Sequence, residues 1–128
     1  MSEPVAGPLV AVVDDDQSIL RSVEQLLESA DYSVRVFSLG ASLLESGCLS
    51  EITCVISDVD MPGMDGFELI RLVHAARPGL PMILITAYPE TLQRLPLLGA
   101  SPPRVFTKPF DGQALLAAVA DAVRSVPG

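Results

Sequence analysis

Hydrophobic residues fall into two alternating kinds of segment along the chain. Continuous apolar runs at 9–13, 52–57 and 81–86 have the length and composition of buried strands. Apolar and polar residues alternate over 32–37, and a shorter run covers 104–107, so both segments are also predicted to be strands. Between the strands, apolar residues recur three or four positions apart, which is the spacing of one helix face. The pattern therefore predicts strands that alternate with helices.

Five helices are predicted between and after these strands. The helical spacing is clearest in three groups: Ile19, Leu20, Val23, Leu26 and Leu27; Phe67, Ile70 and Val73; and Leu115, Leu116, Val119 and Val123. A short helix is predicted around Ala41 to Leu44, closing near Gly47. The rhythm over 89–98 is also helical, but Pro96 interrupts it, so we expect a short or broken helix there.

Strands that alternate with helices are typical of a parallel sheet covered on both faces. Because crossover connections are right-handed, few topologies remain. We therefore predict an α/β fold: a flavodoxin-like, doubly wound, five-stranded parallel sheet in the order 2-1-3-4-5 with five helices. A length of 128 residues suits one domain. We assign residues 9–126 to that domain and residues 1–8 to a flexible N-terminal tail.

Polar residues stand at the ends of four of the predicted strands. Asp14 and Asp15 follow the first strand, and Asp58 ends the third. Thr86 ends the fourth strand, and Lys108 follows the fifth. Ligands of open α/β sheets bind beyond the carboxyl ends of the strands, so we expect these five side chains to meet at one edge.

Several carboxylates at one partly dry edge repel each other unless a cation joins them. Carboxylate and carbonyl oxygens suit Mg²⁺, which proteins usually hold with one or two carboxylates and phosphate oxygens. Phosphoryl transfer uses such a metal together with a cationic side chain, and an aspartate can be the nucleophile. Lys108 is the only lysine in the chain, and its compact ammonium suits a phosphate oxygen or a free carboxylate.

Taken singly, other residues have structural explanations. Asp16 is predicted to cap the first helix, and Asp65 to form a turn. His74 is expected on the solvent side of the third helix. Cys48 and Cys54 fit no metal-binding spacing, so we expect buried, reduced thiols. It is the joint pattern at the strand ends that points to a site.

At these residues the chain resembles the receiver domain of two-component response regulators, over about residues 9 to 126. The resemblance rests on a combination of short motifs: Val13-Asp14-Asp15; Asp58 with Met61-Pro62 and Asp65-Gly66; Thr86-Ala87; and Lys108-Pro109-Phe110. It implies that Asp58 accepts a phosphoryl group from the phosphohistidine of a sensor histidine kinase. It also implies that the peptide bond between Lys108 and Pro109 is cis.

The resemblance further implies the role of each site residue. Asp15 and Asp58 would bind Mg²⁺ through their side chains and Asp60 through its backbone carbonyl, while Asp14 would act largely through a metal-bound water. The groups that would contact the phosphoryl group are the side chains of Thr86 and Lys108 and the backbone N–H groups of Val59 and Ala87.

Such a domain is not an enzyme in the usual sense, since it catalyses only its own phosphorylation and dephosphorylation. Its start and its stretch 107–110 resemble receivers of transcription regulators, which implies a DNA-binding effector domain beyond this chain. A formal net charge of −8 argues against direct nucleic-acid binding by the chain itself. No apolar run is long enough for a membrane span, and we expect a cytoplasmic protein. A phosphorylation-dependent homodimer stays open.

One departure from the family and two alternatives accompany this interpretation. The family usually has an aromatic residue or histidine three positions before the lysine, whereas this chain has Val105, so its output switch should differ. Phe106 should point to the opposite face of the sheet. One alternative is a phosphatase of the haloacid dehalogenase type, although its signature belongs on a first strand. The other is a pseudo-receiver that binds partners without accepting phosphate.

Overall fold

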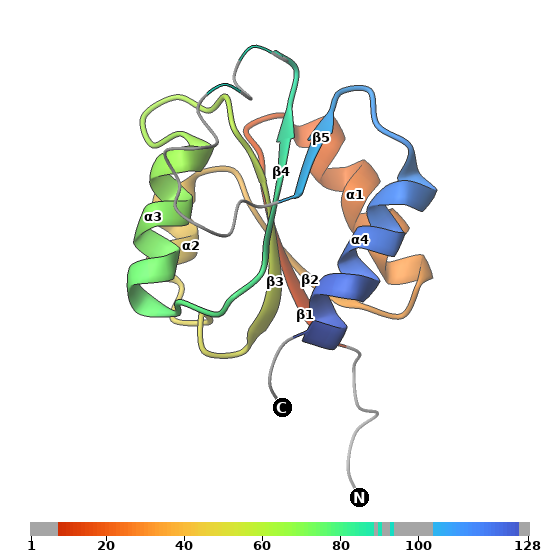
Figure 1. Ribbon diagram of the computed structural model, residues 1–128, viewed down its shortest axis with the longest axis horizontal. Helices are drawn as coiled ribbons and strands as arrows, with labels where there is room; N and C mark the ends of the chain where they lie inside the picture. Colours follow the sequence, from red (N-terminus) through yellow and green to blue (C-terminus); the bar gives the residue numbers. More distant parts are fainter. Residues whose placement is uncertain (1–7, 89, 91–92, 94–103, 126–128) are drawn as a thin grey trace, which may run out of the picture.

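A parallel sheet of five strands forms the centre of the computed structural model, which describes residues 8–88, 90, 93 and 104–125 (Figure 1). The strands are β1 (Leu9–Val13), β2 (Ser33–Phe37), β3 (Ile52–Asp58), β4 (Met82–Thr86) and β5 (Arg104–Thr107). Their order is β2-β1-β3-β4-β5, and every neighbouring pair is parallel. The predicted topology is therefore confirmed.

Among the described residues, two helices cover each face of the sheet. They are α1 (Gln17–Ser29), α2 (Gly40–Glu45), α3 (Gly66–Ala76) and α4 (Gly112–Ser125). Figure 1 shows α2 and α3 on one face and α1 and α4 on the other. The described residues thus hold four of the five predicted helices. The predicted broken helix at 89–98 lies almost wholly outside the described residues, as does the predicted tail at 1–8.

Each face of the sheet has its own hydrophobic core because successive side chains of a strand point to opposite faces. Along β3, Val55 belongs to the core beneath α2 and α3, whereas Cys54 and Ile56 belong to the core beneath α1 and α4. Both cysteines are free and buried, as predicted. Burial raises the pKa of the Cys54 thiol to about 12, so this thiol stays protonated and packs as a small apolar group.

Aspartates fix the start of two helices. Asp16 caps α1, with its Oδ1 accepting hydrogen bonds from the backbone N–H groups of Ser18 and Ile19, which confirms its predicted role. Asp65, predicted only to form a turn, caps α3 by accepting from the N–H of Glu68 at 2.9 Å.

The histidine of α3 departs from its predicted surface position. His74 is half-buried, and its Nε2 lies 3.1 Å from the carbonyl oxygen of Leu80. It therefore helps to join the end of α3 to the chain that enters β4. None of the helices in the described part of the chain combines the length and apolar character that crossing a bilayer requires.

Gly66 lets the start of α3 approach the end of β3 closely. Its backbone N–H donates to the carbonyl oxygen of Val59 at 2.9 Å. A Cβ at this position would lie 2.7 Å from the carbonyl oxygen of Asp58 and 2.8 Å from the Cα of Val59, both of which are backbone atoms. The glycine therefore allows the tight junction that positions the last residue of β3.

We expect Gly66→Ala to lower the free energy of unfolding by about 1–3 kcal/mol, because overpacking against backbone atoms forces the chain to shift. Gly79→Ala is the matched control, since a Cβ there would meet nothing within 4 Å. Urea unfolding of both variants measures the difference. Equal stability of the two variants would show that the junction between β3 and α3 is not tight.

Candidate functional site

The carboxyl ends of β1, β3, β4 and β5 lie side by side. Val13 pairs with Ser57, so Asp14 and Asp58 are the next residues on neighbouring strands. Asp58 in turn pairs with Ile85, the residue before Thr86. Parallel pairing thus brings residues that are far apart in sequence to one edge, as predicted.

Three carboxylates form an acidic cluster at this edge. One oxygen each from Asp14, Asp15 and Asp58 lies within 4.8 Å of the others. Asp14 and Asp58 are only 1% and 4% exposed, whereas Asp15 is exposed. A buried carboxylate needs hydrogen bonds or a cation, because transferring a charge out of water is costly. The cluster has the oxygen ligands that a hard divalent cation prefers.

Lys108 supplies a positive charge to both buried carboxylates. Its Nζ lies 3.3 Å from Oδ2 of Asp14 and 3.6 Å from Oδ2 of Asp58. Its backbone N–H donates to the carbonyl oxygen of Thr86 at 2.8 Å, which continues the pairing of β4 and β5 by one residue. The peptide bond between Lys108 and Pro109 is cis, as expected. A single ammonium therefore serves two carboxylates.

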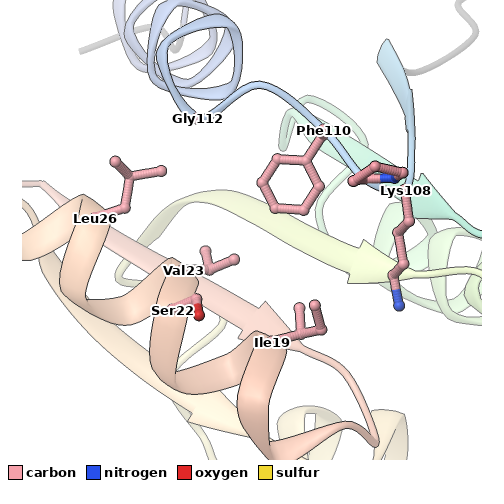
Figure 2. Close-up of a pocket in the computed structure, with 8 residues that line it drawn as sticks. Ile19, Ser22, Val23, Leu26, Lys108, Phe110 and Gly112 are labelled. Carbon is pink, nitrogen blue, oxygen red and sulfur yellow. The ribbon is translucent and has the colours of Figure 1, made fainter.

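Beside Lys108 an apolar pocket of about 550 Å³ opens between α1 and the loop that leads to α4 (Figure 2). Ile19, Val23 and Leu26 of α1 line one side, and Phe110 lines the other. Figure 2 shows the Phe110 ring on the side of the loop that faces α1. The Lys108 side chain extends away from this ring. Because Phe110 packs against the core beneath α1 and α4, it anchors the loop that carries Lys108.

Burial and neighbouring charges shift the pKa values of Asp14, Asp58 and Lys108. Burial, together with the neighbouring Asp14 carboxylate, raises the pKa of Asp58 to about 6, although Lys108 opposes the shift. Burial also raises the pKa of Asp14. Burial by itself would lower the pKa of Lys108, but the carboxylates of Asp14 and Asp58 outweigh it, so this pKa is raised. Lys108 is therefore charged at neutral pH.

Thr86 reaches the predicted edge but its hydroxyl is engaged with Asp60. The Thr86 Oγ1 donates to Oδ2 of Asp60 at 2.8 Å and accepts from the backbone N–H of Tyr88 at 3.0 Å. The N–H of Asp60 donates to Oδ1 of Asp58 at 3.3 Å. Sequence reasoning had given Asp60 only a backbone role. The side-chain contact joins residues 26 positions apart, and no local signal predicts it.

Two further expectations are tested by the geometry. The Val59 N–H, which was expected to contact the phosphoryl group, donates in this structure to the carbonyl oxygen of Ile85 at 2.9 Å within the sheet. Asp60 is the residue whose N–H points to the Asp58 carboxylate instead. Val105 and Phe106 do lie on opposite faces of β5, against the two different cores.

The sequence matches the response regulator receiver domain family over residues 10–120. It is 30% identical over 115 residues to the transcriptional regulatory protein FixJ of Bradyrhizobium diazoefficiens, covering 90% of this chain and 56% of FixJ. It is 33% identical over 115 residues to the DNA-binding transcriptional regulator NtrC of Escherichia coli K12, covering 90% of this chain and 24% of NtrC. The fold is similar to the chemotaxis protein CheY4 of Vibrio cholerae, with a TM-score of 0.80, 30% identity, and coverage of 91% of this chain and 99% of CheY4.

The chain therefore belongs to the response regulator receiver domain family of two-component signalling. Receiver domains are signalling modules and not enzymes in the usual sense. The phosphatase and pseudo-receiver alternatives are not favoured. In particular, Asp58 ends β3, whereas the phosphatase signature belongs on a first strand. The chain spans just over half of the length of FixJ and about a quarter of the length of NtrC.

The raised pKa of Asp58 should make the stability of the metal-free protein depend on pH. The folded protein holds the Asp58 proton up to about pH 6, whereas the unfolded chain releases it near the ordinary value of 3.8. The folded state thus binds more protons in this window, so the free energy of unfolding falls as pH rises through it. We expect Asp58→Asn to raise this free energy by about 1–3 kcal/mol above pH 6 and by much less near pH 4.

Urea unfolding in the presence of a chelator measures this difference at both pH values. Asp31→Asn is the matched control, because Asp31 is exposed and has a φ of 71°, which asparagine tolerates. A gain for Asp58→Asn that is the same at both pH values would contradict the prediction.

Proposed function

We propose that Asp58 accepts a phosphoryl group from the phosphohistidine of a sensor histidine kinase. The observation that carries this proposal is the Asp58 carboxylate, which is buried at the end of β3 beside an acidic cluster and 3.6 Å from Lys108. A nucleophilic carboxylate beside one fixed cation and a set of hard oxygen ligands is suited to phosphoryl transfer. Membership of the receiver family supports the same assignment.

In the proposed reaction an oxygen of the ionised Asp58 carboxylate attacks the phosphorus atom of the donor. The bond between phosphorus and the imidazole nitrogen breaks, and its electron pair remains on the nitrogen. The product is an acyl phosphate on Asp58, which water later hydrolyses back to the carboxylate and inorganic phosphate. Lys108 offsets negative charge on the phosphoryl oxygens through both steps. The domain thus promotes only its own phosphorylation and dephosphorylation.

The residues at this edge fit a Mg²⁺ ion, because the donor set is made of carboxylate oxygens and one cation serves two buried carboxylates. Asp15 and Asp58 would hold the ion through their side chains and Asp60 through its carbonyl oxygen. Asp14 would act largely through a bound water. When bound, Mg²⁺ would neutralise charge on the phosphoryl oxygens.

The partners follow from the family and from the similar proteins. We propose a receiver domain over residues 9–126 that receives its signal in the cytoplasm. FixJ is a transcriptional regulatory protein and NtrC a DNA-binding transcriptional regulator. A C-terminal DNA-binding effector domain beyond this chain is therefore the proposed recipient of the signal, either directly or through a phosphorylation-dependent homodimer.

Incubation with acetyl phosphate and Mg²⁺ should add one phosphoryl group to the protein, detected by intact mass. Asp58→Asn should abolish the adduct, because an amide is not the required nucleophile. Asp60→Asn controls for the loss of a neighbouring carboxylate and should still form the adduct. An adduct of unchanged yield in Asp58→Asn would refute the assignment of the acceptor.

Mg²⁺ affinity should depend on Asp15 but not on the neighbouring Asp16. We expect Asp15→Ala to weaken Mg²⁺ binding at least about tenfold, because it removes a direct ligand. Asp16→Ala should leave this affinity nearly unchanged but cost about 1 kcal/mol of stability, because Asp16 caps α1. Calorimetric Mg²⁺ titration and urea unfolding of both variants provide the two measurements. Equal losses of Mg²⁺ affinity would mean that the ligand assignment is wrong.

A further inference from the structure

The hydroxyl proton of Thr86 is committed to a carboxylate. The Thr86 Oγ1 lies 2.8 Å from Oδ2 of Asp60 and 3.2 Å from the carbonyl oxygen of Tyr88, and both are acceptors. The contact with Asp60 is the shorter, and its acceptor is charged, so it is the stronger of the two. Thr86 is itself fully buried, so water does not compete for its hydroxyl.

This arrangement conflicts with the contact to a phosphoryl oxygen that the resemblance to receiver domains implies for Thr86 in the phosphorylated state. A threonine hydroxyl has one O–H donor, so it cannot donate to Asp60 and to a phosphoryl oxygen on Asp58 at the same time. The two acceptors therefore compete for one proton. Formation of one hydrogen bond requires the loss of the other.

We propose that the Asp60 carboxylate is a latch that holds the Thr86 hydroxyl in the unphosphorylated domain, and that phosphorylation of Asp58 releases it. This inference rests on the proposed function of Asp58. Asp60 is a positioning residue here, since its side chain acts through Thr86. Its backbone carbonyl keeps the separate role assigned above.

Charge couples the latch to the phosphoryl group. Asp60 lies two residues after Asp58, and its N–H donates to Oδ1 of Asp58 at 3.3 Å. A phosphoryl group on Asp58 would add negative charge close to the Asp60 carboxylate, and this charge would repel the Asp60 side chain. The same group presents oxygen acceptors to Thr86. Phosphorylation therefore weakens the old contact and supplies the new one.

The released hydroxyl would carry the change to the surface. Thr86 Oγ1 accepts from the backbone N–H of Tyr88, and Tyr88 is 53% exposed. A shift of the hydroxyl thus alters the backbone that follows β4. This route does not need the aromatic residue that the family usually has where this chain has Val105.

A double-mutant cycle tests the latch, with beryllofluoride and Mg²⁺ as the phosphoryl mimic. Calorimetry compares the wild type, Asp60→Ala, Thr86→Ala and the double variant. We expect Asp60→Ala to tighten beryllofluoride binding about tenfold when Thr86 is present, and only about twofold when it is absent. Equal gains in both backgrounds would show that Asp60 acts through charge alone, and a loss of affinity in Asp60→Ala would show that it supports the bound state. Either result overturns the proposal.

Amide hydrogen exchange of Tyr88 tests the latch without any phosphoryl mimic. Asp60→Ala should speed exchange at Tyr88 several-fold, because an unlatched Thr86 holds the Tyr88 N–H less firmly. Asp60→Asn, which keeps the shape and an oxygen acceptor, should have a smaller effect and serves also if the alanine variant does not fold. Unchanged exchange in both variants would refute the latch. Failure of the wild type to bind beryllofluoride would instead count against the proposed function.

Discussion

Two buried carboxylates, Asp14 and Asp58, share the single ammonium of Lys108 at the carboxyl edge of the sheet. Burial disfavours both charges, and the two carboxylates repel each other. The fold maintains this unfavourable arrangement because the two cores on either face of the sheet fix the strand ends. The same repulsion makes the edge receptive to a divalent cation, whose positive charge offsets that of the carboxylates. Stability and reactivity are therefore opposed at this site.

The parts of the site differ in how firmly they are held. Asp14 and Asp58 extend buried strands, and the loop of Lys108 is anchored by Phe110 against the core. Gly66 allows α3 to press against the backbone of Asp58 and Val59. The hydroxyl of Thr86, in contrast, is held by hydrogen bonds to the half-buried loop carboxylate of Asp60 and to the backbone of Tyr88. In the proposed function, Asp58 would be the rigidly held acceptor and the hydroxyl of Thr86 the group that moves.

Val105 stands where the family usually has an aromatic residue, so a signal in this domain would have to use other contacts, such as that of Asp60 with Thr86. Val105 packs against the core beneath α2 and α3, and Phe106 packs on the opposite face, so β5 contains no aromatic residue that could turn inward at the usual position. The hydrogen bonds from Thr86 to Asp60 and from Tyr88 to Thr86 would provide another path from the proposed acceptor to the surface. A ligand or a covalent group shifts an equilibrium only through contacts that differ between two states. In the proposed latch the hydroxyl of Thr86 would make such contacts, because its one proton would go to Asp60 in one state and to a phosphoryl oxygen in the other.

The sequence by itself determined the strands, their order and the five residues at the shared edge. Apolar periodicity is a local property, and parallel crossovers leave few topologies, so Asp14 and Asp58 could be placed on neighbouring strands before any coordinates were known. The caps and hydrogen-bond partners were less predictable. Asp65 proved to cap α3, His74 to be half-buried, and the Val59 N–H to belong to the sheet. Only the tertiary structure could decide that the Thr86 hydroxyl is bound to Asp60, because that contact depends on how the end of β4 packs against the loop after β3 and leaves no periodic trace in the chain.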